Sequence, residues 1–186
     1  MQLRLPKSML KSALVALVAY IIAGIVLTIV VEHIPTTPIA RMNEFVAINN
    51  NNPEVYGSGY YRSLEPAAGM LDGYIGTPLA LLVAGMAFGL FARNRGVSRG
   101  TVLKWSAGWG AFLAFITDMF NLAAVAIVQM VSGAASTYVF DPKHISAAAL
   151  GIFALQLVIG YAAGLLGALI TFRAGRRPVA VAKSAA

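Results

Sequence analysis

Four polar side chains set within long apolar stretches could carry chemistry: Tyr20, Asp118, Asn121 and Gln156. Asp118 is the only ionisable carboxylate that sits at the middle of such a stretch. A charged aspartate at the centre of a membrane helix costs about 2.5–3.5 kcal/mol on insertion scales, so it must face protein or water. Helical spacing places Asn121 one turn from Asp118, and the other two side chains lie at nearly the same depth. We expect one hydrogen-bonded cluster of all four.

Two roles fit Asp118. No Lys or Arg lies at its depth, so the carboxyl group must be protonated, hydrated, paired with a bound cation or matched by another subunit. A protonated carboxyl group could join helices by donating to Asn121, Gln156 or a backbone carbonyl. Acids inside membranes also mark proton and ion pathways, which would make Asp118 a relay.

A second group of candidate ligands flanks the apolar stretches on one side of the membrane: His33, His144, Glu32 and Asp141. Such side chains bind Zn, Cu or Fe, and two axial imidazoles can hold a haem. No pair of these ligands recurs at helical spacing within a stretch, so the pattern favours solvation and capping over a metal site. We therefore favour no cofactor.

The sequence also lacks the motifs of common enzymes. It contains no Gly-x-Ser-x-Gly elbow, His-Glu-x-x-His motif, P-loop or dinucleotide fingerprint, so it does not favour an enzyme. The absence of cysteine excludes disulfides, thiolate metal sites and cysteine nucleophiles.

Four apolar runs must position these residues, at about 12–31, 69–92, 105–131 and 145–172. Each has the roughly 20 residues needed to cross a hydrocarbon core about 30 Å thick. With 59% hydrophobic and 11% charged residues, the chain is not expected to be a soluble domain. The pattern predicts an all-α integral membrane protein, an up-and-down bundle of four transmembrane helices over 12–172. A basic N-terminus, 1–11, precedes it, and a basic tail, 173–186, follows and is expected to be disordered.

The basic residues predict the orientation of these helices. All but three of the 14 lysines and arginines lie before the first run, between the second and third, or after the fourth; the exceptions are Arg41, Arg62 and Lys143. The positive-inside bias therefore puts both termini in the cytoplasm, with the first run kept as a signal anchor. The net charge of +7 then reflects topology, and nucleic acid is not an expected partner. Short loops and the lack of an organelle address favour a bacterial inner membrane.

The first outer loop, 32–68, is the one long enough for further structure. Thr37 followed by Pro38 resembles an N-cap with proline at the first helical position, and Ile39, Met42 and Val46 recur at helical spacing. A short interfacial helix is predicted here.

Small residues indicate how the spans pack, because helices in lipid associate through close contact and hydrogen bonds. We expect Pro78 to kink the second span. The expected contact glycines lie in the second and fourth spans: Gly85, Gly89, Gly160, Gly164 and Gly167.

The function best favoured by this pattern is an accessory or structural subunit of a larger membrane complex, because four spans with modest loops leave little room for an independent active site. The expected partners are the lipid bilayer and other membrane subunits or further copies of the chain. The alternative is a proton- or cation-coupled channel or carrier with Asp118 as the titrating group. A weaker alternative is an outer-face metal or haem protein that uses His33 and His144.

Overall fold

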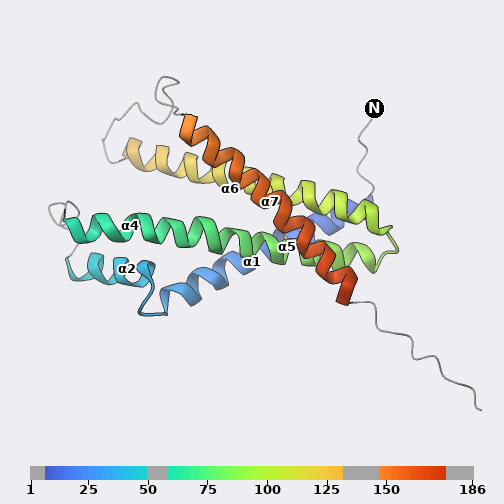
Figure 1. The fold of residues 1–186 in the computed structure, drawn as a ribbon, viewed down its shortest axis with the longest axis horizontal. Helices are drawn as coiled ribbons and strands as arrows, with labels where there is room; N and C mark the ends of the chain where they lie inside the picture. The colour runs from blue at the N-terminus through green and yellow to red at the C-terminus, as the bar shows by residue number, and fades with distance from the viewer. Residues whose placement is uncertain (1–6, 50–57, 132–146, 175–186) are drawn as a thin grey trace, which may run out of the picture.

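The computed structural model describes residues 7–49, 58–131 and 147–174, and these residues contain helices and no strand (Figure 1). This confirms an all-α protein for the described part of the chain. The elements in chain order are α1 (Lys7–Glu32), α2 (Pro38–Ile48), α4 (Gly59–Leu71), the π-helical segment η1 (Asp72–Gly76), α5 (Thr77–Arg93), α6 (Arg99–Val131) and α7 (Ala147–Ala174).

Three stretches of these helices are long and apolar enough to cross a membrane: Met9–Glu32, Ala67–Arg93 and Leu150–Arg173. They overlap three of the four predicted runs, which supports insertion into a membrane. The longest helix, α6, has 33 residues but is not among the three. Its role as a fourth crossing therefore stays a prediction.

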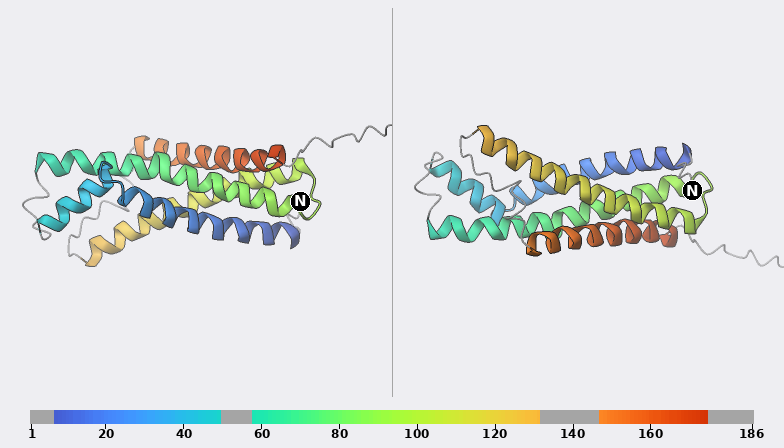
Figure 2. Two further views of the ribbon diagram at one scale, coloured as in Figure 1. Left: turned by 90° about the horizontal axis from the view of Figure 1, so that it is seen from below. Right: turned by 90° about the horizontal axis from the view of Figure 1, so that it is seen from above.

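The long helices alternate in direction, and α6 is inclined to α5 (Figure 2). One end of the molecule holds the start of α1, the α5–α6 turn and the end of α7. We call it the basic end, because it carries Lys11, Arg93, Arg95, Arg99, Lys104 and Arg173. The opposite end, called the far end, holds α2 and the start of α4.

Buried apolar side chains gather in the half of the molecule next to the basic end. There α5 is central and packs against α1, α6 and α7. Phe88 of α5 is the largest fully buried side chain among the described residues, and small neighbours let the helices close around it. The core comprises Met9, Ala13, Ala16, Leu81, Ala84, Phe88, Ala92, Val102, Leu113, Ala114, Ala163 and Ala168.

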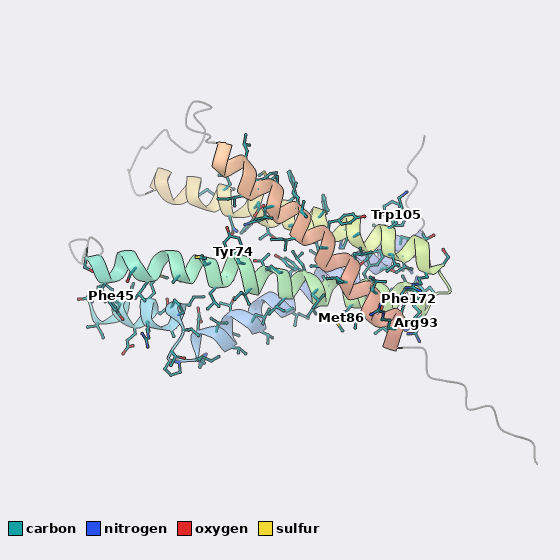
Figure 3. All side chains as sticks on the ribbon, in the orientation of Figure 1. Phe45, Tyr74, Met86, Arg93, Trp105 and Phe172 are labelled. Atoms are coloured by element: carbon teal, nitrogen blue, oxygen red, sulfur yellow. The ribbon has the colours of Figure 1, made fainter. Side chains whose placement is uncertain are left out.

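The α5–α6 connection closes the basic end with a Schellman turn. Gly96 adopts φ +71°, a conformation that glycine takes without a Cβ penalty. The N–H of Val97 donates to Ala92 O at 3.3 Å, and that of Gly96 to Arg93 O at 2.9 Å. The Arg93 guanidinium also donates to Thr171 O at 2.8 Å, which ties α5 to the last turn of α7 (Figure 3).

The π-helical segment joins α4 to α5 at the start of the second apolar run. The N–H of Thr77, the residue that follows the segment, donates to Asp72 O, five residues back. Pro78 has no N–H to offer the carbonyl four residues before it, and its ring crowds that carbonyl. The chain relieves this conflict by widening the helix just before the proline. The sequence predicted a disturbance at Pro78 without its π-helical form.

Glycines allow the backbone of α7 to touch both α5 and α6. A Cβ added to Gly85 would lie 2.5 Å from Gly164 O, and one added to Gly160 would lie 2.6 Å from Gly110 O. The hydroxyl of Ser106 on α6 donates to Gly164 O at 2.8 Å. Gly89 faces Thr171 and Ala168, and Gly167 faces Leu82 and Met86. These contacts fix α7 between its two neighbours.

We expect Gly164→Leu to lower the free energy of unfolding by about 1–3 kcal/mol or more, because a side chain there would meet the backbone of Ser106 and Gly110 and push α6 away from α7. The change is measurable by denaturant titration in detergent micelles, followed by circular dichroism. The matched control on the same helix is Gly151→Leu, since an added Cβ there meets no atom within 4 Å. Equal stability of the two variants would contradict the backbone contact.

Candidate functional site

Asp118 of α6 and Gln156 of α7 face each other across the helix contact. With the amide oriented so that its NH2 group meets the carboxyl group, Gln156 donates to both oxygens of Asp118, with Oδ2 at 2.8 Å. The Gly110–Gly160 contact two turns away brings these two helices close enough for this pair. The deep acid is therefore partnered inside the chain, by a neutral side chain.

Tyr20 of α1 reaches α6 at the residue next to Asp118. Its hydroxyl lies 2.7 Å from Thr117 Oγ1, which in turn donates to Leu113 O at 2.9 Å. Because Thr117 has one hydroxyl proton and gives it to a carbonyl, Tyr20 is the donor in this pair. This bond ties the middle of α1 to the middle of α6.

The four side chains of the predicted cluster therefore do not form one group. They divide between two adjacent faces of α6. Asp118 and Gln156 meet between α6 and α7, whereas Tyr20 meets Thr117 between α1 and α6. Asn121, one turn beyond Thr117 on α6, is exposed and makes no hydrogen bond with the other three. Thr117 was absent from the predicted set, although its position beside Asp118 within an apolar run could have drawn attention to it.

Asn121 and Tyr20 share a cavity of about 190 Å³, which we call the polar cleft. It lies between α1, η1, α5 and α6, in the half of the molecule toward the far end. Polar side chains from all four elements line it: Tyr20, Thr28, Asp72, Thr77, Thr117 and Asn121. Apolar residues such as Leu27, Val31 and Leu71 complete the walls. A cavity with this many polar groups suits water or a polar ligand.

Asp72 is the acid of the polar cleft, and sequence reasoning missed it. It stands at the first position of η1, about 8 Å along the helix from Ala67, where the apolar stretch begins. A Cβ added at Gly76 would lie 3.1 Å from Asp72 Oδ1, so the carboxylate lies over this glycine, which also lines the cleft. The signal in the sequence was an acid followed by two glycines and then Pro78 inside an apolar run.

The polar cleft continues toward the far end into a wider cavity of about 430 Å³. The two cavities share Thr28, Ile39 and Asp72, and the wider one adds Glu32 and Asn43. Helix α2 forms part of this outer wall, where Thr37 caps it by accepting from Ala40 N at 3.2 Å. Two neighbouring cavities, lined by the carboxylates of Asp72 and Glu32, thus lie between Tyr20 and α2.

The predicted histidine site is only partly within the described residues. Nδ1 of His33 lies 2.8 Å from Ile29 O and, facing a carbonyl, must donate to it. Asp141 and His144 lie outside the residues that the structure describes. Within residues 7–49, 58–131 and 147–174, no group of three or more His, Asp or Glu side chains could hold a metal ion.

We expect Asp118→Leu and Gln156→Leu each to destabilise the protein by about 1 kcal/mol, because each leaves the other polar group unpaired between helices. Asp118→Asn keeps an acceptor oxygen and should cost less. A double-mutant cycle should give a coupling energy of about 0.6–1.7 kcal/mol. As a control, Asp118→Leu combined with Leu150→Ala, an exposed site, should be additive. Additive effects of Asp118→Leu and Gln156→Leu would contradict the pairing.

Comparison of the chain with protein-family models, with curated proteins and with solved structures finds no match.

Proposed function

We propose that the protein is a small membrane carrier that takes a proton or another cation into the polar cleft. The observation that carries this proposal is the cavity itself, which is open toward the far end and lined by Asp72, Tyr20, Thr117 and Asn121. Side chains of this kind are costly among lipid tails and are tolerated where they line a pathway or meet water.

A cation suits the polar cleft because the carboxylates on its walls carry negative charge. The carboxylate of Asp72 stands inside it, and that of Glu32 stands on the wall of the outer cavity. Hydroxyl and amide oxygens of Tyr20, Thr117 and Asn121 could complete the coordination of a hard cation. Acidic groups in a cleft with apolar walls also raise the local concentration of cations. In this proposal Asp72 takes the role in the cleft that the sequence assigned to Asp118.

The contrast between the two halves of the molecule supports a carrier over an open channel. Beyond Tyr20 and Thr117 the path meets the packed core around Phe88, and the Schellman turn closes the basic end. A cavity open on one side and sealed on the other is what one state of an alternating carrier requires.

The proposed topology has four crossings, with α6 as the third and both termini in the cytoplasm of a bacterial inner membrane. The basic segments 1–11, 93–104 and 173–186 contain no Asp or Glu, so the charge difference between the two sides is not offset locally. The polar cleft then faces the periplasm, and α2 lies at the outer membrane surface.

A second candidate function is an accessory subunit of a membrane complex. The Asp118–Gln156 pair favours it, because the deepest acid is engaged in holding two helices together rather than in lining the cleft. Native mass spectrometry of the protein from its source membrane distinguishes the two functions. A fixed complex with other chains supports the subunit, whereas a protein free of other chains supports the carrier.

We expect purified protein in liposomes to dissipate a proton or monovalent-cation gradient, reported by an enclosed pH- or cation-sensitive dye. Asp72→Asn should lower the rate at least about tenfold, because the amide cannot release a proton or offset the charge of a cation in a site of low dielectric constant. Tyr20→Phe should lower it less, since one ligand oxygen is lost.

The control is Glu44→Gln, which removes an exposed acid on α2 that does not line either cavity. It should leave the rate unchanged. A wild-type protein that moves no cation, or an Asp72→Asn variant as fast as wild type, would overturn the carrier.

A further inference from the structure

A third cavity, of about 290 Å³, lies on the opposite half of the molecule from the polar cleft, between α1, α5 and α6 near the basic end. We call it the apolar groove. Its walls carry no charged side chain, and it shares no residue with the polar cleft. The groove is lined by Met9, Leu10, Ala13, Phe88, Trp105, Gly108, Trp109 and Phe112.

The apolar groove is open to the surroundings of the helices. Leu10 is 62% exposed and Phe112 is 47% exposed, so these side chains form its rim. Trp109 and Phe112 stack with ring centroids 5.0 Å apart. Gly108, which also lines the groove, is exposed, and a Cβ added there meets no atom within 4 Å. An extended apolar chain could therefore lie directly against the α6 backbone at this point.

Positive charge stands at the end of the groove that is nearer the basic end. Lys104 precedes Gly108 by one helical turn and Phe112 by two, so all three lie on one stripe of α6. Lys11, exposed like Lys104, lies on α1 between the groove residues Leu10 and Ala13 and adds a second positive charge beside the groove. Trp105 follows Lys104 directly on α6 and lies toward the basic end (Figure 3). An apolar channel with tryptophan and lysine at its mouth matches the order of tails and head groups in a lipid.

A buried polar atom deeper in the groove also matches the order of tails and head groups in a lipid. The indole Nε1 of Trp109 is buried and has no acceptor among the described residues. A buried donor without a partner costs free energy. Trp109 lies about 8 Å along the helix from Lys104, where a membrane offers the ester carbonyl of a lipid as an acceptor, and Nε1 would reach this carbonyl once the indole turns toward the groove.

We propose that the apolar groove is a specific site for one anionic phospholipid, with an acyl chain along Gly108 and the phosphate beside Lys104 and Lys11. The competing occupant is a helix of a partner protein, whose side chains could also enter the groove. A zwitterionic lipid could place an acyl chain in the apolar groove but would leave the two lysines without a net negative partner.

The test uses the full chain in nanodiscs made of equal parts phosphatidylglycerol and phosphatidylcholine, released into the gas phase for native mass spectrometry. Wild type should retain one phosphatidylglycerol. Gly108→Leu fills the groove and should lower the retained lipid about tenfold. Lys104→Gln should lower the preference for phosphatidylglycerol about fivefold, in keeping with the attraction of one lysine to an anionic surface.

Two matched controls are Gly151→Leu, at an exposed glycine with equally open space, and Arg41→Gln, at an exposed cation on α2. Both should retain lipid as wild type does. Phosphatidylglycerol with a photoactivatable acyl chain provides a measurement that needs no variant, since it should label the segment from Trp105 to Phe112.

Three outcomes would overturn the proposal. They are retention by Gly108→Leu equal to wild type, equal retention of the two lipids by wild type, and labelling spread evenly over α1, α5, α6 and α7. A second protein chain bound to wild type and lost from Gly108→Leu would also overturn it, in favour of a protein partner.

Discussion

The close approach of α7 to α5 and α6 is the constraint on which the rest of the structure depends. Lipid tails are as apolar as the helix surfaces, so hydrophobicity does little to hold these helices together within a membrane. Contact between backbones at Gly85 and Gly164, and at Gly110 and Gly160, supplies the dispersion attraction instead. Because this contact fixes α6 against α7, Asp118 can meet Gln156 without a charged partner.

The same packing divides the molecule into two unlike halves. Toward the basic end, small residues and Phe88 close the core, and Arg93 joins the last turn of α7 to α5. Toward the far end, polar side chains such as Asp72, Thr117 and Asn121 line the polar cleft between the helices. The Tyr20–Thr117 hydrogen bond lies at the boundary between the packed core and the polar cleft. The molecule thus combines a tightly packed half with a half that contains a polar cavity.

The sequence predicted the helices well and the site less completely. Hydropathy gave the three apolar helices, because twenty apolar residues have few alternatives to a membrane helix. Depth along a helix can be counted from the sequence, which is why Asp118 and Gln156 were placed at one level, and the structure brings these two side chains together. The angles between helices cannot be read from a sequence, and these angles bring Tyr20 to Thr117 rather than to Asp118. Asp72 escaped notice because its importance arises from η1, and the hydropathy of a run does not reveal a π-helical segment.

The π-helical segment also fixes a rotation. A ring closed five residues back holds one residue more than an α-helical ring, so side chains on its two sides are offset by about one residue, or 100° around the axis. Helix α4 can therefore face α2 while α5, its direct continuation, faces α1, α6 and α7. Removal of a single residue between Asp72 and Gly76 would restore a uniform helix and swing the outer segment away from its neighbour. One inserted residue, in a stretch without any catalytic motif, would then account for both the orientation of the outer segment and the presence of a carboxylate in the cleft.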